Sequence, residues 1–203
     1  MDQSPELIPN PASPEEETSS APVKKYPIKR LIFDLLETLL LSVLIFLVIN
    51  TVSARIRVES VSMQPTLYEG DFVIVNRLAY RFGEPGRGDI IVFRPPTNPQ
   101  AEPYIKRVIG LPGDRIHVEN GVVAVNGIAL REPYIKSPPN YTGTWVVPQD
   151  SLFVLGDNRN NSSDSHQWGM VPLSEVIGTA EIIYLPVSHW QVLNPSTAAA
   201  AQP

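Results

Sequence analysis

Two serines and one lysine carry the chemistry that this sequence offers. Ser60 and Ser62 lie in the stretch 60–67 (SVSMQPTL), a few residues after a hydrophobic span, and Lys106 lies downstream in the stretch 104–107 (YIKR). A serine hydroxyl is a poor nucleophile at neutral pH, and a desolvated lysine amine can act as its base. The pattern therefore suggests a membrane-tethered hydrolase in which a lysine activates a serine.

An extended segment at 58–62 would position the two serines. Alternation along a strand would place Ser60 and Ser62 on one face and would turn Val61 into the core. Pro65 lacks a backbone donor and restricts the residue before it, which would end the strand just past Ser62. Taken alone, the stretch could equally be a serine-rich turn.

Lys106 occupies the middle of an apolar run, and alternation directs its side chain to the face opposite Ile105 and Arg107. Desolvation among strand residues disfavours the charged ammonium and would lower the pKa of Lys106 from about 10.4 towards the range useful for a base. The alternative is an exposed strand lysine, which is the commoner case.

The hydrophobic span predicts a transmembrane anchor at 28–54. Residues 38–54 carry no charge, and apolar residues before Asp34 lengthen the segment towards the width of a bilayer. A buried core helix would also be apolar, as would a cleaved signal sequence. The long polar preamble and the missing small-residue cleavage site argue against the signal sequence.

Basic residues flank the span unevenly. Four precede it (Lys24, Lys25, Lys29 and Arg30), whereas only Arg55 and Arg57 follow closely. The positive-inside rule then leaves the amino terminus in the cytoplasm and the rest of the chain on the trans side, in a periplasm or a thylakoid lumen.

The ends of the chain differ in composition from its middle. Residues 1–23 hold five acidic side chains, several prolines and no Lys or Arg, so we expect a disordered cytoplasmic tail over 1–27. The Ala/Pro/Gln segment 194–203 is expected to be a flexible tail. The remainder, 55–193, is expected to be one β-rich domain.

Composition also excludes several classes of function. The acidic and basic side chains outside the first 23 residues balance, with no basic stripe interleaved with aromatic residues, so nucleic acid is not an expected partner. The chain has no cysteine, which excludes disulfides and thiol catalysis. His117 and His189 lack a second ligand at a suitable spacing, so we expect no metal and no cofactor.

From residue 55 onward, short β-branched runs alternate with Gly, Pro and Asn, which is typical of an antiparallel, mainly β fold. The dipeptides at 120–121 and 126–127 are Asn-Gly, which favours tight turns between antiparallel strands. Strands are predicted at 71–75, 89–93, 104–109, 115–118, 122–125, 151–155 and 176–185.

Four stretches in order resemble the conserved boxes of the type I signal peptidase family, membrane-bound serine proteases with a Ser/Lys dyad. They are 60–67 (SVSMQPTL), 87–93 (RGDIIVF), 104–114 (YIKRVIGLPGD) and 156–165 (GDNRNNSSDS). The resemblance implies a signal-peptidase-like antiparallel β domain behind one anchor, in a minimal form. It also implies an endopeptidase that removes N-terminal signal peptides from exported preproteins after small residues at the −3 and −1 positions.

Carried over by position, the resemblance implies that Ser62 is the nucleophile and that neutral Lys106 is the general base. Ser60 would complete the oxyanion hole, and Ser162 would hydrogen-bond the lysine amine. The residues that would support the loop are Asp157, Asn158, Arg159 and Asp164.

Two positions depart from the commonest form of the last box, with Asn160 where an Asp is frequent and His166 where an Arg is. Asp164 would then pair with a histidine that holds charge only at lower pH, unless Arg159 takes the place of the usual arginine.

Partners and rivals follow from this interpretation. The implied partners are secretory preproteins, the lipid bilayer and the export machinery. Among enzymes, the alternatives are a self-cleaving repressor-type Ser/Lys protease and a specialised pilin or conjugation maturase. Among proteins that are not enzymes, the alternative is a membrane-tethered β adaptor.

Arg77 and Arg81, with Tyr80 between them, form either a basic patch near the membrane or a solvated strand end.

Overall fold

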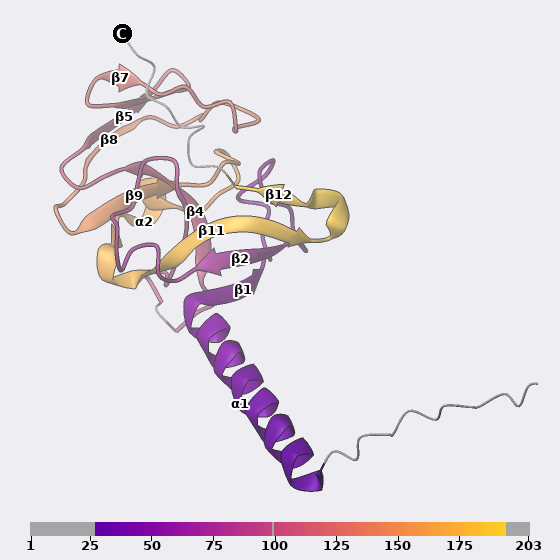
Figure 1. Cartoon of the computed structure of the whole chain (residues 1–203). Helices are drawn as coiled ribbons and strands as arrows, with labels where there is room; N and C mark the ends of the chain where they lie inside the picture. The colour runs from indigo at the N-terminus through magenta and orange to yellow at the C-terminus, as the bar shows by residue number, and fades with distance from the viewer. Residues whose placement is uncertain (1–26, 99, 194–203) are drawn as a thin grey trace, which may run out of the picture. The chain divides into compact units, whose positions relative to one another are not determined.

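The computed structural model describes residues 27–98 and 100–193 (Figure 1). The tails predicted at 1–27 and 194–203 lie outside this range, apart from Pro27. The chain divides into two compact units, one up to Val43 and one from Leu44 onward. The predicted domain bounds at 54 and 55 stay predictions.

The N-terminal element is one helix, α1 (Ile28–Val52), of 25 residues and with no buried side chain. Its length of about 37 Å exceeds the hydrocarbon core of a bilayer, about 30 Å. Among the described residues, it is the one helix long and apolar enough to cross a membrane.

The larger sheet has eight strands, and every pair in it is antiparallel. In spatial order its path runs through β1 (Ser53–Arg57), β2 (Phe72–Asn76), β11 (Val176–Leu185), β3 (Ile90–Phe93), β4 (Tyr104–Gly110), β9 (Ser151–Leu155) and β10 (Val171–Pro172), while β12 (Gln191–Val192) pairs with β11. Figure 1 shows β11 as a long arrow beside β2.

The smaller sheet has four antiparallel strands in the order β7 (Ile128–Ala129), β6 (Val122–Val125), β5 (Arg115–Glu119) and β8 (Gly143–Val146). The helical pieces after β9 are α2 (Ser165–Trp168), η1 (Leu173–Glu175) and η2 (Val187–His189).

The predicted fold class is confirmed, and so are all seven predicted strands, to within a residue at each end. Asn120 and Asn126 have positive φ angles of 50° and 54°, and the glycines after them are also positive, as the predicted tight turns require. The sequence did not predict β1, β8 or the two-residue strands, which lack a β-branched run.

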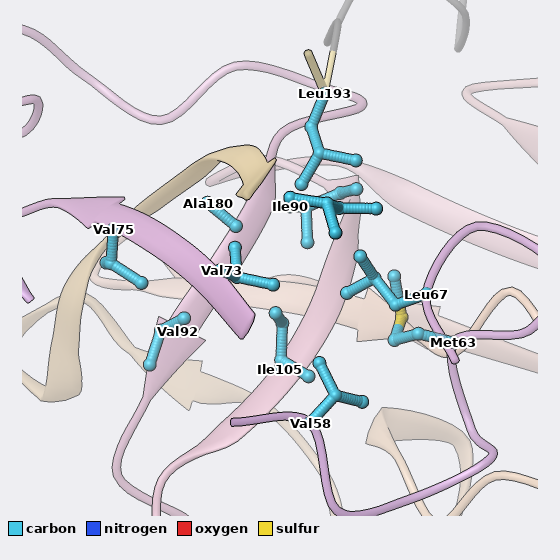
Figure 2. Packing of buried hydrophobic residues seen from close by; sticks show 11 residues of the cluster. Val58, Met63, Leu67, Val73, Val75, Ile90, Val92, Ile105, Ala180 and Leu193 are labelled. Carbon is cyan, nitrogen blue, oxygen red and sulfur yellow. The ribbon is translucent and has the colours of Figure 1, made fainter. Parts of the chain in front are cut away.

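One buried hydrophobic cluster contains direct chain neighbours of Ser62 and Lys106. Met63, Leu67 and Ile105 pack together with strand residues such as Val73 and Val92 (Figure 2). Burying a Met or Leu side chain contributes about 1.5–3 kcal/mol. Because Met63 follows Ser62 and Ile105 precedes Lys106, this cluster fixes the backbone next to both reacting groups.

Candidate active site

The segment that carries Ser62 is a turn, and the prediction of a strand over 58–62 is wrong. β1 ends at Arg57, and the backbone then turns at 61–66. Asn158 supplies the contacts that a neighbouring strand would give: its side-chain amide donates to Val61 O at 3.1 Å, and its backbone N–H donates to Ser62 O at 3.0 Å. Val61 is half-buried at the edge of a groove and does not enter the core.

The two serines nevertheless meet, because the turn brings their side chains to the same side. The Oγ atoms of Ser60 and Ser62 are 3.1 Å apart. In the described part of the chain, the Ser62 backbone N–H donates to no other protein group. A hydroxyl and a backbone N–H are therefore available beside the Ser62 oxygen.

Lys106 reaches Ser62 from β4. Its Nζ donates to Ser62 Oγ at 2.7 Å and to Ile105 O at 3.1 Å, and the residue is only 4% exposed. Burial lowers the pKa of Lys106 to about 8, against the opposing effect of the carboxylates of Asp164 and Asp157. An appreciable fraction of the amine is thus neutral near neutral pH.

Asp157 joins the loop at 156–164 (the catalytic loop) to the strand that carries Lys106. Arg107 donates to both of its carboxylate oxygens, at 2.8 and 2.7 Å, and Thr66 donates to Oδ2 at 2.5 Å. Both carboxylate and guanidinium are fully buried, so the pair satisfies charges that would be costly alone. The sequence did not single out Arg107 or Thr66, although both lie inside the quoted boxes.

Asp164 organises the other end of that loop. It caps α2, accepts from the Gly156 N–H at 2.9 Å, and accepts from His166 Nδ1 at 2.5 Å. The His166 ring stacks on Tyr141 at 4.0 Å between centroids. Of the two alternatives left open by the sequence, the histidine is the one that bonds Asp164.

Arg159 points elsewhere and does not replace the missing arginine. It donates to the two carboxylate oxygens of Glu132 at 2.7 and 2.6 Å and to Gly156 O at 3.2 Å. Tyr134 donates to Glu132 at 2.9 Å, and its ring lies 4.0 Å from the Arg107 guanidinium carbon. Glu132 and Tyr134 were not predicted, because no motif links the return between β7 and β8 to this loop.

The side-chain amide of Asn160 lies at the surface and makes one hydrogen bond as a donor and one as an acceptor. It donates to Pro138 O and accepts from the Asn140 N–H, each at 2.9 Å. An ionised aspartate could accept but not donate, so it could not make the hydrogen bond that Asn160 donates to Pro138 O.

Ser162 does not make the bond that the resemblance implies. Its Oγ is buried and has no hydrogen-bond partner in the described part of the chain, while Lys106 bonds Ser62 and Ile105. A Cβ on Gly156 would lie 2.3 Å from this Oγ and 2.4 Å from Ser62 O. The Ser162 hydroxyl and the Ser62 backbone therefore close around one glycine.

A groove of about 740 Å³ opens beside the reacting atoms. Its walls come from residues 54–62 and 102–106, with Asn161 and Ser163 from the catalytic loop, Arg77 from the end of β2 and Ile177 from β11. Ser62 and Lys106 are both among the residues that line the groove. A hydroxyl, a buried amine and two adjacent hydrogen-bond donors next to a peptide-sized groove are suited to acyl transfer.

Residues 32–185 match the family described as signal peptidase, peptidase S26. The chain belongs to this signal peptidase family. A "Signal peptidase I" of Leptolyngbya laminosa is 49% identical over 79% of this chain and 83% of the relative. A "Probable signal peptidase I-1" of Synechocystis is 45% identical over 71% and 78%, and a "Signal peptidase I" of Bacillus caldolyticus is 41% identical over 66% and 80%.

As a member of the signal peptidase family, the protein is a serine endopeptidase that cleaves signal peptides from preproteins. It is also a membrane-anchored protein, since α1 is the apolar helix at its N-terminal end. The predicted family and the predicted enzyme class are confirmed.

Proposed function

We propose that this signal peptidase hydrolyses the peptide bond with a dyad of Ser62 and neutral Lys106. The observation that supports the proposal is the bond of 2.7 Å between Lys106 Nζ and Ser62 Oγ, inside a buried site. A base must lie within hydrogen-bond reach of the proton that it removes, and its pKa must be close to the working pH. Lys106, with a pKa lowered to about 8, meets both conditions.

In the proposed mechanism the neutral amine of Lys106 accepts the Ser62 proton as Ser62 Oγ attacks the scissile carbonyl. Negative charge develops on the carbonyl oxygen, and the Ser60 hydroxyl and the Ser62 backbone N–H donate to it. One such donor typically contributes about 2.7–4 kcal/mol to the transition state. The ammonium of Lys106 then protonates the leaving amine, and a water hydrolyses the acyl-enzyme with Lys106 again as base.

Ser162, Asp157, Asn158, Arg159 and Asp164 support this centre in the proposal. Asn158 holds the Ser62 backbone, Asp157 holds Arg107 next to Lys106, and Asp164 and Arg159 hold the Gly156 end of the loop. For Ser162, the buried hydroxyl next to the Ser62 backbone supports a role in orienting the amine once a substrate enters.

The proposed specificity is for small residues at −3 and −1. Val61, Ile105 and Tyr104 contribute apolar lining to the groove that contains Ser62. Shallow apolar subsites of this kind discriminate by excluding larger side chains.

The proposed orientation leaves the amino terminus in the cytoplasm and the catalytic unit on the trans side, in a periplasm or a thylakoid lumen. The excess of basic residues before α1 supports it. A substrate held by its own signal helix would share the plane of the membrane and so gain effective concentration. Association with the export machinery would fit this position.

The test is cleavage of a preprotein by the purified full chain. Ser62→Ala and Lys106→Ala should each lose cleavage, and so should Lys106→Arg, because guanidinium keeps its proton. The exposed Lys136 provides the matched control as Lys136→Ala, which should cleave normally. Full activity of Ser62→Ala or of any Lys106 variant would refute the dyad. An adaptor, the rival outside enzymes, would bind the preprotein but leave it intact even as wild type.

A further inference from the structure

The loop between β2 and β3 has features that the proposed proteolysis does not use. At its tip, Phe82 is 88% exposed, the largest exposed fraction among the large hydrophobic side chains of the described residues. A single exposed apolar side chain is ordinary on a protein surface. The surroundings of Phe82 give it a more specific meaning.

Hydrogen bonds order the loop on both sides of Phe82. The Asp89 carboxylate accepts from the Tyr80 hydroxyl at 2.9 Å and from the Gly86 N–H at 2.8 Å. At the start of the loop, Asn76 Oδ1 accepts from the Leu78 N–H at 2.9 Å. The segment that carries the exposed Phe82 is therefore tied to the fold at both ends.

A cavity of about 840 Å³ lies beside the loop, and its charged lining is basic: three arginines, Arg77, Arg81 and Arg94, against the single carboxylate of Glu84. Within the described residues, the guanidiniums of Arg77 and Arg81 make no hydrogen bond or ion pair. Arg94 makes only a long ion pair, 3.8 Å, with Glu175. In the described part of the chain, the cavity thus presents two guanidiniums without an internal partner and a third with one distant carboxylate.

The last turn of α1, which belongs to the same compact unit, also lines this cavity through Asn50 and Thr51. The Arg77 N–H donates to Val52 O at 2.9 Å, where the helix ends. Because α1 is about 7 Å longer than a bilayer core of about 30 Å, its ends reach the level of the lipid headgroups.

We propose that this cavity binds the anionic headgroup of a membrane lipid, and that Phe82 enters the interface beside it. The planar guanidinium matches the paired oxygens of a phosphate or sulfonate group, and basic side chains near an anionic leaflet are attracted to it. The site would give the catalytic unit a second contact with the bilayer. It rests on the membrane anchoring in the proposed function but not on the dyad.

The absence of cysteine allows a direct test on the full chain in lipid nanodiscs. A single nitroxide label is placed at Phe82→Cys, with Leu40→Cys in α1 as the lipid-exposed reference and Glu119→Cys in β5 as the aqueous reference. Accessibility to a lipid-soluble and to a water-soluble relaxation agent is compared in discs of neutral lipid and in discs that also contain anionic lipid.

We expect the label at 82 to be lipid-exposed in anionic discs and mostly aqueous in neutral discs. Adding Arg81→Gln and Arg94→Gln should weaken docking by about fivefold for each arginine, whereas the matched control Arg115→Gln on β5 should not. Preprotein cleavage in the same discs reports the dyad separately, since Arg81 and Arg94 lie outside the groove.

An aqueous label at 82 together with a lipid-exposed label at 40 would overturn this site and leave the anchor intact. An aqueous label at 40 would overturn the anchor and this site with it. Equal docking in neutral and anionic discs would overturn the headgroup assignment. Soluble glycerol phosphate, at constant ionic strength, should compete with the lipid headgroup for the cavity and weaken docking; docking that is unchanged by a large excess of it would overturn the cavity as the headgroup site.

Discussion

The carboxylate of Glu132 holds the Arg159 guanidinium through two short hydrogen bonds, 2.6 and 2.7 Å long, with both side chains almost entirely buried. Glu132 belongs to the return between β7 and β8, whereas Arg159 belongs to the catalytic loop. Tyr134 lies between this pair and Arg107, which holds Asp157. The small sheet thereby supports the loop around Ser62 and Lys106.

Glu132→Gln should destabilise the protein strongly. It leaves the Arg159 cation buried without its counter-charge, a change that typically costs about 3–5 kcal/mol. Denaturant unfolding measures the loss. Glu119→Gln is the matched control, because Glu119 is 59% exposed and its contact with His117 is at the surface. A loss in Glu132→Gln no larger than in Glu119→Gln would contradict this account.

The sequence singled out Ser62 and Lys106, whose side chains the structure brings into contact, but it did not predict this support. Lys106 and Ser62 lie in dense local motifs, and the strand that carries Lys106 has a clear apolar run, so their places could be inferred. Glu132 has no such signal, since its partner lies 27 residues away and only the packing of the small sheet brings them together. The sequence left a strand and a turn open at Ser62 for a related reason, because the backbone partner of Ser62 is Asn158, far along the chain.

The loop around Ser162 shows the limit of inference by resemblance. The box 156–165 correctly located a buried loop against the nucleophile, but the expected bond from Ser162 to Lys106 is not formed. Similarly, the departure at His166 left two possible partners for Asp164; His166 bonds it and stacks on Tyr141, while Arg159 is held by Glu132.

Gly156→Ala should abolish cleavage while the protein stays folded. The added methyl would lie 2.4 Å from Ser62 O and 2.3 Å from Ser162 Oγ, so the nucleophile backbone must shift. Displacement of a reacting group by about 1 Å can cost about 100-fold in rate. Gly86→Ala is the control, since the new methyl there would meet only Asp89 side-chain atoms at ordinary distances, 3.6 Å and beyond. Wild-type turnover by Gly156→Ala would show that the loop adapts without cost.

Lys106→Met should stabilise the protein below about pH 8 and lose this advantage as the pH rises. Burial lowers the pKa of Lys106 from 10.5 to about 8, so between these values the unfolded chain binds more protons than the folded one and stability rises with pH. The destabilisation of the folded state by the buried ammonium is fully present below the folded-state pKa of Lys106 and absent above its unfolded-state pKa. The difference of the two values corresponds to about 3 kcal/mol at most.

Melting temperatures of wild type and Lys106→Met across that range measure the effect. The exposed Lys136 gives the control, because Lys136→Met should change stability little at any pH. A constant difference between wild type and Lys106→Met from neutral to alkaline pH would mean that Lys106 ionises like a solvent-exposed lysine.

The rate of cleavage should follow the same ionisation. Because the base must be neutral, kcat/KM for a preprotein is expected to rise about tenfold for each pH unit below the pKa of Lys106 and to level off above about 8. Since the carboxylate of Asp157 raises this pKa, Asp157→Asn should move the midpoint to lower pH in whatever activity remains. His117→Gln is the control for an unrelated titration, since His117 is exposed on the small sheet and should leave the profile unchanged. If the wild type stays folded over this range, a value of kcat/KM that does not change from acidic to alkaline pH would show that Lys106 is not the general base.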